Sequence, residues 1–268
     1  MSTESVNPKT KGISDCSTEQ ALYLINDEDA TVANAVRENV PIIAKLVDCG
    51  VKTIANGGRI FYCGCGTSGR IAVADAAECP PTYGVSRDLV TAVIAGGVNA
   101  MINALEGCED SKERGVQAFI DAGVKEKDLV IGVSANGRAP FVLAFMEEAK
   151  KIGCTVGAIV NNTQTEMAKI ADIAIETLTG AEAIKGSTRM KAGTSQKMIL
   201  NMFSTTVFIK SGCTYQNYMV NMIPNNKKLR ARAVSMVSDI LEVSPSVAEE
   251  YLQASEWNIK KAIKSNLK

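Results

Sequence analysis

Residues 59–78 read RIFYCGCGTSGRIAVADAAE and contain the pattern that decides the fold. The apolar run Arg59–Cys63 predicts a buried strand, and Ile71–Glu78 predicts a helix. Glycines and two hydroxyl residues lie between them, at positions 64–69. A strand, a tight glycine turn and a helix in this order form the first half of a βαβ unit.

Four more short apolar runs follow, separated by helical stretches: Val90–Ala95, Leu129–Val133, Thr155–Val160 and Ile173–Ile175. Continuous rather than alternating apolarity suits strands that are buried on both faces. The sequence therefore predicts an α/β fold with a doubly wound, five-stranded parallel sheet between layers of helices. In such sheets ligands bind beyond the carboxyl ends of the strands, so the turns at 64–69 and 134–138 are the places to look.

Helical patterns flank the predicted sheet. The first 56 residues predict N-terminal helices, and Lys191–Ser211 predicts a buried helix after the last strand. Pro224-Asn225-Asn226 marks a boundary before three short helical segments. We predict a main domain with its N-terminal helical segment over residues 1–223 and a C-terminal three-helix unit over 224–268.

Charge and composition exclude several classes of partner. The chain has 29 basic and 29 acidic residues, so no net field attracts it to nucleic acid or to an anionic membrane. No apolar run approaches the roughly 20 residues that span a bilayer. The N-terminus lacks the charged and then apolar pattern of a signal peptide, which predicts a cytoplasmic protein.

The chain contains no histidine, and its eight cysteines form no C-x-x-C pair. Histidine is the usual general base near neutral pH and the commonest ligand of catalytic zinc. Acid–base chemistry must therefore come from carboxylates, lysine, tyrosine or cysteine.

The two turns offer groups that bind anions. Gly66, Thr67 and Ser68 precede a helix whose N-terminal amides, with the two hydroxyl groups, suit a phosphate. A purely structural tight turn remains the alternative. The second turn, Ser134-Ala135-Asn136-Gly137-Arg138, also joins a strand to a helix and offers a hydroxyl, an amide and backbone N–H groups. The pair of turns is a stronger indication than either alone.

Two carboxylates are candidates for catalysis. Glu78 lies just before Pro80 and Pro81, which are predicted to end the helix, and Glu109 lies in an acidic turn. The local pattern of each alone is better explained by an ordinary carboxylate, Glu109 at a helix start and Glu78 at a solvated helix end. Ten residues of helix from Ser68 to Glu78 would span about 15 Å, more than a hexose phosphate. This distance suggests that Glu78 acts across a subunit interface, unless the chain bends back before the prolines.

Five blocks of the sequence together resemble the N-acetylmuramic acid 6-phosphate etherases of the sugar-isomerase (SIS) superfamily. They are Asn26–Asp29, Gly64–Arg70, Ala77–Val85 (AECPPTYGV), Leu105–Ser111 (LEGCEDS) and Gly186–Lys197 (GSTRMKAGTSQK). The resemblance spans roughly residues 17 to 267. The ECPPT and GSTRMKAGT blocks are specific to the etherases, whereas the glycine turn is common to SIS domains. The glucokinase regulatory protein has the same type of domain.

The resemblance implies a five-stranded, flavodoxin-like αβα sandwich and a homodimer with its active site at or near the interface. It implies cleavage of the D-lactyl ether of N-acetylmuramic acid 6-phosphate, with Glu78 as the acid and Glu109 as the base. Thr67, Ser68 and Ser134 would hold the phosphate, and Lys191 would supply positive charge. The implied reaction requires no metal and no organic cofactor. The C-terminal segment is similar to a UBA-like bundle.

The second turn departs from the family pattern Ala-Ser-Gly-Arg-Thr-Pro. Asn136 and Ala139 stand in place of two hydroxyl residues, which bears on phosphate affinity and on substrate choice. Two alternatives therefore stay open: a non-catalytic phosphosugar-binding regulator and a phosphosugar isomerase. Both would share the turns, but neither would require both glutamates.

Overall fold

The computed structural model describes residues 2–267, in which five parallel strands form one sheet in the order β2-β1-β3-β4-β5. The strands are β1 (Ile60–Gly64), β2 (Val90–Ile94), β3 (Leu129–Ser134), β4 (Thr155–Val160) and β5 (Ile173–Glu176). All five predicted strands are confirmed, with ends that differ by at most 1 residue. Because β1 and β3 are neighbours in the sheet, the two glycine turns that follow them leave it side by side.

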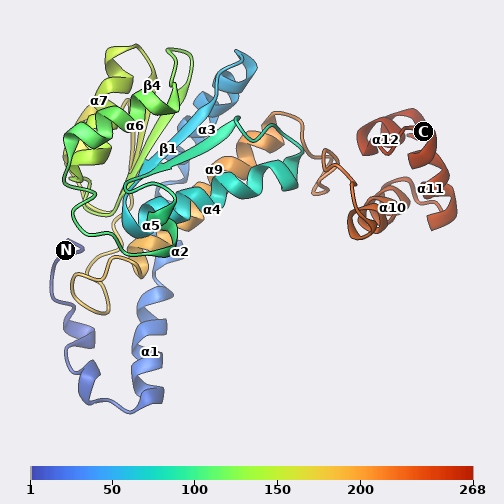
Figure 1. The fold of residues 1–268 in the computed structure, drawn as a ribbon. Coiled ribbons are helices and arrows are strands. Elements are labelled where there is room, and N and C mark those ends of the chain that lie inside the picture. The colour runs from blue at the N-terminus through green and yellow to red at the C-terminus, as the bar shows by residue number, and fades with distance from the viewer. Residues whose placement is uncertain (1, 268) are drawn as a thin grey trace. The chain divides into compact units, whose positions relative to one another are not determined.

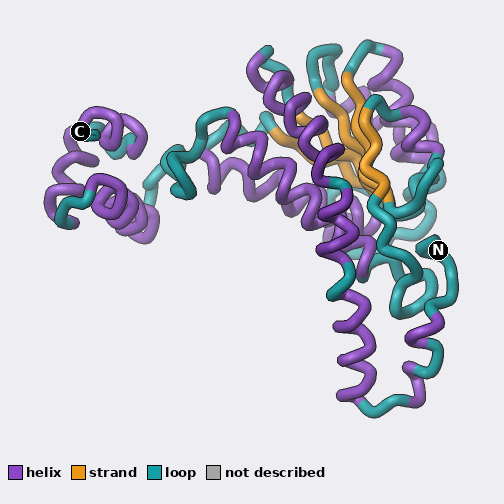
Figure 2. Tube along the Cα trace, turned by 180° about the vertical axis from the view of Figure 1, so that it is seen from behind, coloured by secondary structure: helices purple, strands orange, loops and turns teal. Residues whose placement is uncertain are grey.

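Helices cover both faces of the sheet, which confirms the predicted αβα sandwich (Figures 1 and 2). Helices α6 and α7 lie on one face, and α3, α4 and α9 lie on the other. The helices are η1 (Pro8–Thr10), η2 (Ile13–Asp15), α1 (Thr18–Asp29), α2 (Val32–Glu38), α3 (Val40–Ala55), α4 (Gly66–Tyr83), α5 (Asn99–Ile102), α6 (Lys112–Ala122), α7 (Pro140–Lys151), α8 (Glu166–Ile170), α9 (Lys191–Lys210), α10 (Lys227–Leu241), α11 (Pro245–Ala254) and α12 (Ile259–Asn266).

The strands are apolar throughout because both of their faces are covered. On one face, Val130 of β3 and Val156 of β4 belong to the same buried cluster as Phe145 of α7. On the other face, the ring of Tyr62 in β1 meets Phe203 of α9 edge to face, with ring centroids 6.2 Å apart. Burial of this apolar surface is the main stabilising contribution to the fold.

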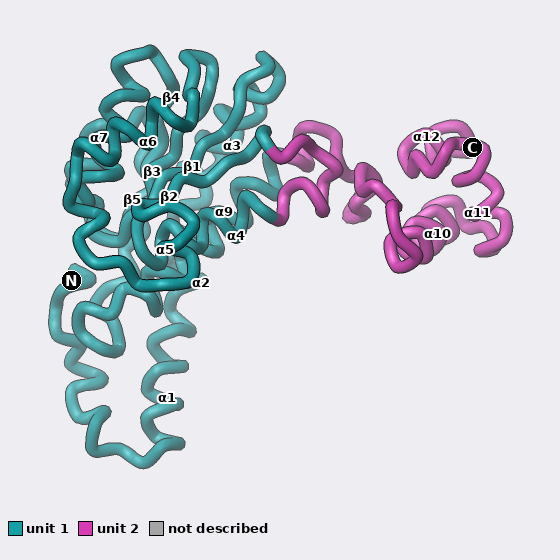
Figure 3. The backbone as a smooth tube through the Cα atoms, viewed as in Figure 1, with its two compact units in different colours: residues 1–77, 88–207 teal, residues 78–87, 208–268 magenta. Residues whose placement is uncertain are grey.

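The chain divides into two compact units (Figure 3). The first comprises the residues up to Ala77 and Asp88–Val207, and it contains the sheet. The second comprises Glu78–Arg87 and the residues from Phe208 onward. Its helices α10, α11 and α12 correspond to the three predicted segments and bury a core of their own. The predicted boundary at residue 224 falls inside this second unit, and the likeness to a UBA bundle stays a prediction.

Helix α4 corrects one expectation. The prolines at 80 and 81 were expected to end the helix, but it continues through both to Tyr83. A proline ring removes an N–H donor and crowds the carbonyl four residues earlier, so Pro80 and Pro81 weaken this end of the helix without ending it. The N–H of Gly84 still donates to the carbonyl of Pro80 at 2.9 Å, so the last turn closes after the prolines.

Candidate active site

The link between the first strand and the helix after it is a single residue, because Gly66, Thr67 and Ser68 already belong to the helix. Strand β1 ends at Gly64 and α4 begins at Gly66, so only Cys65 separates them. Gly66 has a φ of +51°, a left-handed conformation that glycine adopts without strain. The amides of the first turn of α4 then lie directly beyond the strand, together with the half-buried Thr67 and the buried Ser68. This arrangement can bind a phosphate at a helix N-terminus.

The second turn uses its own side chains to fix its shape. The Ser134 hydroxyl accepts a hydrogen bond from the N–H of Gly137 (3.1 Å) and donates to Oδ1 of Asn136 (3.2 Å). The same Oδ1 accepts the N–H of Arg138 at 3.0 Å. Ser134 and Asn136 therefore stabilise the turn, whereas the Arg138 side chain is exposed. These bonds hold the turn in one conformation, which fixes where a ligand can lie beside it.

Replacing Gly137 with alanine is expected to lower the free energy of unfolding by about 2 to 4 kcal/mol. Gly137 has a φ of +65°, and an added Cβ would lie 2.5 Å from the Cβ of Thr165. Urea denaturation measures the loss.

The matched control is Gly66→Ala, whose φ is also positive but whose added Cβ would meet nothing within 4 Å. This control tests backbone strain alone and should lose about 1 kcal/mol. Equal losses in the two variants would show that the contact with Thr165 does not matter.

The loop that carries Glu109 lies against the first turn and against the helix that follows the second. The carbonyl of Glu109 accepts the N–H of Phe141, in the first turn of α7, at 3.0 Å. Glu109 also lines a cavity of about 270 Å³ together with Cys65, Gly66 and Arg70. Of the two candidate carboxylates, Glu109 is therefore the one that the first unit places beside the first turn.

The charge of Glu109 reaches the first turn. Burial, followed by the charges of Glu109 and of the nearby Cys108 and Asp110, raises the pKa of Cys65 to about 12. The Cys65 thiol therefore stays protonated near neutral pH, and a neutral thiol is a poor nucleophile. The carboxylate rather than the cysteine is the group suited to catalysis in this cavity.

A second cavity, of about 420 Å³, lies at the second turn. Asn136 and Arg138 of the turn line it, together with Asn162, Thr165 and Leu178. With Ser2, Glu4 and Thr163, the lining combines amides, hydroxyls, one carboxylate and one guanidinium. These groups suit the hydroxyl groups of a sugar, and the Arg138 guanidinium suits an anion. The first unit thus contains two cavities at the carboxyl edge of the sheet.

Glu78 lies on α4, ten residues after Ser68, with an exposed side chain. It belongs to the second compact unit, whereas Glu109 belongs to the first. The two predicted catalytic residues are thus not gathered within one unit of the chain. Their joint action in one site stays a prediction.

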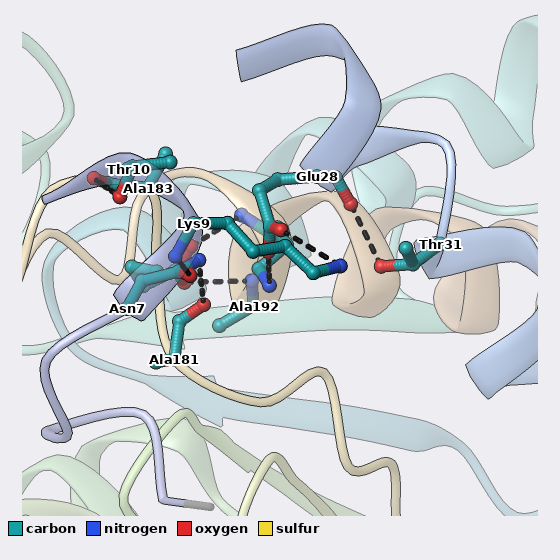
Figure 4. Close-up of polar contacts among 10 residues, drawn as sticks. Asn7, Lys9, Thr10, Glu28, Thr31, Ala181, Ala183 and Ala192 are labelled. Carbon is teal, nitrogen blue, oxygen red and sulfur yellow. Dashed lines mark hydrogen bonds and ion pairs between the residues drawn. The ribbon is translucent and has the colours of Figure 1, made fainter. Parts of the chain in front are cut away.

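Lys191 is the first residue of α9, and its side chain is only 3% exposed. Its Nζ lies 2.5 Å from Oε2 of Glu28, in α1. The backbone N–H groups of Lys191 and Ala192 donate to the Glu182 carboxylate, each at 2.9 Å, so that Glu182 caps α9 (Figure 4 shows this region). The ammonium group is paired with Glu28 rather than with either turn, and its predicted contact with phosphate stays a prediction.

The partners of Glu28 and Glu182 shift the pKa values of these two buried carboxyl groups in opposite directions. Burial opposes ionisation of Glu28, but hydrogen bonds from Lys191 and Asn7 and the charges of Lys191 and Lys9 hold its pKa below the ordinary value. For Glu182, burial outweighs the hydrogen bonds from the N–H groups of α9 and raises the pKa. Glu28 is thus the carboxylate that balances the charge of Lys191.

Sequence reasoning missed the asparagines that hold the second turn. The backbone N–H of Asn161 and the side-chain Nδ2 of Asn162 both donate to the carbonyl of Ala135, each at 3.0 Å. The signal was available, because both asparagines directly follow the buried strand β4 at the ligand-binding edge of the sheet.

Within residues 2–267, no three or more Cys, Asp or Glu side chains gather in a way that could hold a metal ion. Across that same part of the chain, none of the helices combines the length and the apolarity needed to cross a bilayer. All eight cysteines are free thiols.

Comparisons with known proteins agree with this architecture. The family model of the glucokinase regulatory protein N-terminal SIS domain matches residues 42–150, and the SIS domain model matches residues 117–206. The N-acetylmuramic acid 6-phosphate etherase of Clostridioides difficile (strain 630) is 48% identical over 261 residues, which are 97% of this chain and 86% of that protein. The protein of the same name from Geobacillus sp. (strain WCH70) is 43% identical and covers 98% of this chain, with 89% of its own length matched.

Solved structures share the fold at low identity. The phosphoheptose isomerase of Francisella tularensis aligns with a TM-score of 0.54 at 15% identity, covering 72% of this chain and 98% of its own. The phosphoheptose isomerase of Neisseria gonorrhoeae aligns with a TM-score of 0.55 at 13% identity, covering 71% of this chain and 99% of its own.

Proposed function

This chain belongs to the N-acetylmuramic acid 6-phosphate etherase family, and on that basis we propose that it cleaves the D-lactyl ether at C3 of N-acetylmuramic acid 6-phosphate. The products are N-acetylglucosamine 6-phosphate and D-lactate, as in the recycling of cell-wall sugars. The observation that carries the proposal is the position of Glu109, which lines one cavity with the first turn and is bonded to the start of α7. A base beside a phosphosugar site is what the reaction needs.

The reaction is an elimination followed by the addition of water. Opening of the sugar ring exposes an aldehyde at C1, which acidifies the proton on C2. A base removes that proton, the C3–O bond breaks, and an acid protonates the departing lactate oxygen. Water then adds at C3 of the unsaturated aldehyde. Two carboxyl groups in opposite protonation states suffice for these steps.

We assign Glu109 as the base at C2, and Glu78 as the acid that protonates lactate and then activates water. The amides at Gly66, with Thr67 and Ser68, hold the phosphate at the N-terminus of α4. The second turn contributes the Arg138 guanidinium, because the N–H groups of Gly137 and Arg138 are already bonded to Ser134 and Asn136 within the turn. Support for these assignments comes from the sequence motifs and from the two cavities beside the turns.

The active form is proposed to be a cytoplasmic homodimer with the site at or near the subunit interface. Support for a shared site comes from α4, along which Glu78 lies about 15 Å beyond Ser68 at 1.5 Å per residue. Support for the cytoplasm comes from the eight free cysteines, which are typical of a reducing compartment.

Purified protein incubated with N-acetylmuramic acid 6-phosphate in ²H₂¹⁸O is the direct test. The proposal expects free D-lactate, deuterium at C2 and ¹⁸O at C3 of the N-acetylglucosamine 6-phosphate, with no ¹⁸O in lactate. Label in lactate would indicate direct displacement at the lactyl carbon. Binding of the sugar phosphate without lactate would favour a regulator, and interconversion of aldose and ketose phosphates would favour an isomerase.

A mixture of two inactive variants is expected to regain activity if the site is shared. Glu78→Gln and Glu109→Gln chains, unfolded together and refolded, should form mixed dimers in which one of the two sites has both glutamates. Random pairing then predicts about a quarter of the wild-type activity. A mixture as inactive as its components would mean that each site takes both glutamates from one chain.

A further inference from the structure

Residues 2–10, here called the N-terminal strap, are bonded to loops at the carboxyl edge of the sheet. The side chain of Asn7 donates to the carbonyl of Ala181 at 3.3 Å, and that of Thr10 donates to the carbonyl of Ala183 at 2.7 Å (Figure 4). Both acceptors lie in the loop between β5 and α9. Asn7 and Thr10 are buried, so the strap is an integral part of the first unit.

An ion-pair cluster anchors the far end of the strap. The Nζ of Lys9 lies 3.4 Å from Oε1 of Glu28, whose Oε2 pairs with the buried Lys191. The strap, α1 and the start of α9 are thus held together by charge. The ion pairs thus hold the strap at Lys9, and its opposite end, at Thr3, lies near the second turn.

At that other end, Thr3 is fully buried and contacts Asn162 twice. Its backbone N–H donates to Oδ1 of Asn162 at 3.2 Å, and its Oγ1 accepts a bond from Nδ2 at 2.9 Å. The same Nδ2 also donates to the carbonyl of Ala135 in the second turn, at 3.0 Å. Thr3 therefore sets the direction in which the Asn162 amide points, and that amide holds the turn.

The strap also forms a wall of the cavity of about 420 Å³ at the second turn. Ser2 and Glu4, the neighbours of Thr3, line it together with Asn136 and Arg138. Residues 2–5 form a tight turn, in which the N–H of Ser5 donates to the carbonyl of Ser2 at 3.1 Å. In this turn Thr3 is buried against Asn162, while the exposed Ser2 and Glu4 line the cavity.

We propose that Thr3 is a positioning residue for phosphosugar binding, which acts by orienting Asn162 and through it the second turn. This inference rests on the proposed function, because it takes the second turn as part of the sugar-phosphate site. It assigns to the N-terminal strap a role in substrate affinity as well as in folding. The hydrogen bonds of Thr3 reach the turn through Asn162, so we expect Thr3 to affect binding rather than the chemical steps.

The test compares Thr3→Val with Thr3→Ser and Thr10→Val. Thr3→Val removes the hydroxyl that orients Asn162, and we expect about a tenfold rise in KM and in the Kd of N-acetylglucosamine 6-phosphate. The kcat should stay within about twofold of the wild-type value, because the bond between Thr3 and Asn162 involves neither Glu78 nor Glu109. Thr3→Ser retains the hydroxyl and should restore both values.

Thr10→Val is the matched control, because it removes a buried threonine hydroxyl from the same strap without affecting Asn162. It should lower Tm as much as Thr3→Val does while leaving KM and Kd unchanged. If Thr3→Val lowers Tm but leaves both constants unchanged, or if Thr10→Val raises them equally, the positioning role is wrong. The Kd is measured without turnover. A wild type that binds the phosphosugar but releases no lactate would therefore overturn the proposed function and leave this inference to be decided by the variants.

Discussion

Replacing Glu78 with glutamine is expected to lower kcat for D-lactate release by about 10³-fold or more. The amide can neither protonate the departing lactate oxygen nor activate the water that adds at C3. Removal of the C2 proton by Glu109 does not need Glu78, so unreacted substrate should still exchange its C2 hydrogen for deuterium. The measurement is lactate release together with mass spectrometry of the recovered substrate in ²H₂O.

Glu109→Gln should separate the two roles, because it removes the base and abolishes lactate release and C2 exchange together. Glu147→Gln, an exposed glutamate on α7, makes the same chemical change away from both cavities and should behave as the wild type. If Glu78→Gln lost C2 exchange while Glu109→Gln retained it, the assignments of acid and base would be reversed. Full activity in Glu78→Gln would remove Glu78 from the mechanism.

Replacing Lys191 with methionine is expected to lower the free energy of unfolding by about 3 to 5 kcal/mol. The side chains of Lys191 and Glu28 are 3% and 6% exposed, so the change leaves a buried carboxylate without its main partner. In a domain of this size the loss corresponds to a fall in Tm of roughly 10 °C. The Nζ of Lys9 lies 3.4 Å from Oε1 of Glu28 and remains as a second partner of this carboxylate. We therefore expect the loss to be toward the lower end of that range.

The double variant Glu28→Gln with Lys191→Met is the decisive comparison, because it removes both charges together. It should recover most of the lost stability, since a buried ion pair can be replaced by neutral groups at little loss. If instead the losses of the two single variants added, the pair would not be coupled. Thermal and urea unfolding of the four proteins measure the coupling directly.

The ion pair of Glu28 and Lys191 makes the free energy of unfolding depend on pH. The pKa of Glu28 is lower in the folded chain than its ordinary value. Its ionised form therefore stabilises the fold at pH values above the ordinary pKa. This contribution is lost as the pH falls through the lowered pKa. Glu28→Gln cannot titrate at this position, and its stability should therefore fall less steeply with acid than that of the wild type.

The sheet was predictable because strands buried on both faces are apolar at every position. Leu129–Ser134 is buried throughout in the structure, and it is among the most uniformly apolar runs in the sequence. The end of α4 was not predictable by the same reasoning. Each proline removes one N–H donor from the helix but leaves its own carbonyl free to accept a bond. The N–H of Gly84 bonds to the carbonyl of Pro80, so the helix gains a further turn that a rule based on the prolines alone does not predict.

The glycine turns were predictable as the links that follow β1 and β3, but the glycines alone do not identify a ligand. Gly64, Gly66 and Gly69 also have the G-x-G-x-x-G spacing of dinucleotide-binding turns. That class of site requires an acidic residue at the end of the next strand, and β2 ends at Ile94 and is followed by Ala95-Gly96-Gly97. Similarity over nearly the whole chain, rather than this spacing, places the chain in its family.

Contacts between distant parts of the chain explain what the sequence did not reveal at the site. Lys191 stands in a block typical of the family, and its charge suggested a phosphate ligand. Its partner Glu28 lies 163 residues away, so only the folded chain shows that the charge is balanced. Thr3 and Asn162 carry no motif that links them, because a threonine and an asparagine are common in loops.

The N-terminal strap also constrains when the protein can complete its folding during synthesis. Thr3 and Asn162 are 159 residues apart, and Asn7 and Ala181 are 174 apart. At roughly 5 to 20 residues per second, the ribosome delivers these partners on the order of 10 to 30 s after the strap has been made. The strap is therefore among the last segments to dock although it is made long before its partners, and a nascent chain that stalls before β4 has no complete wall around the cavity.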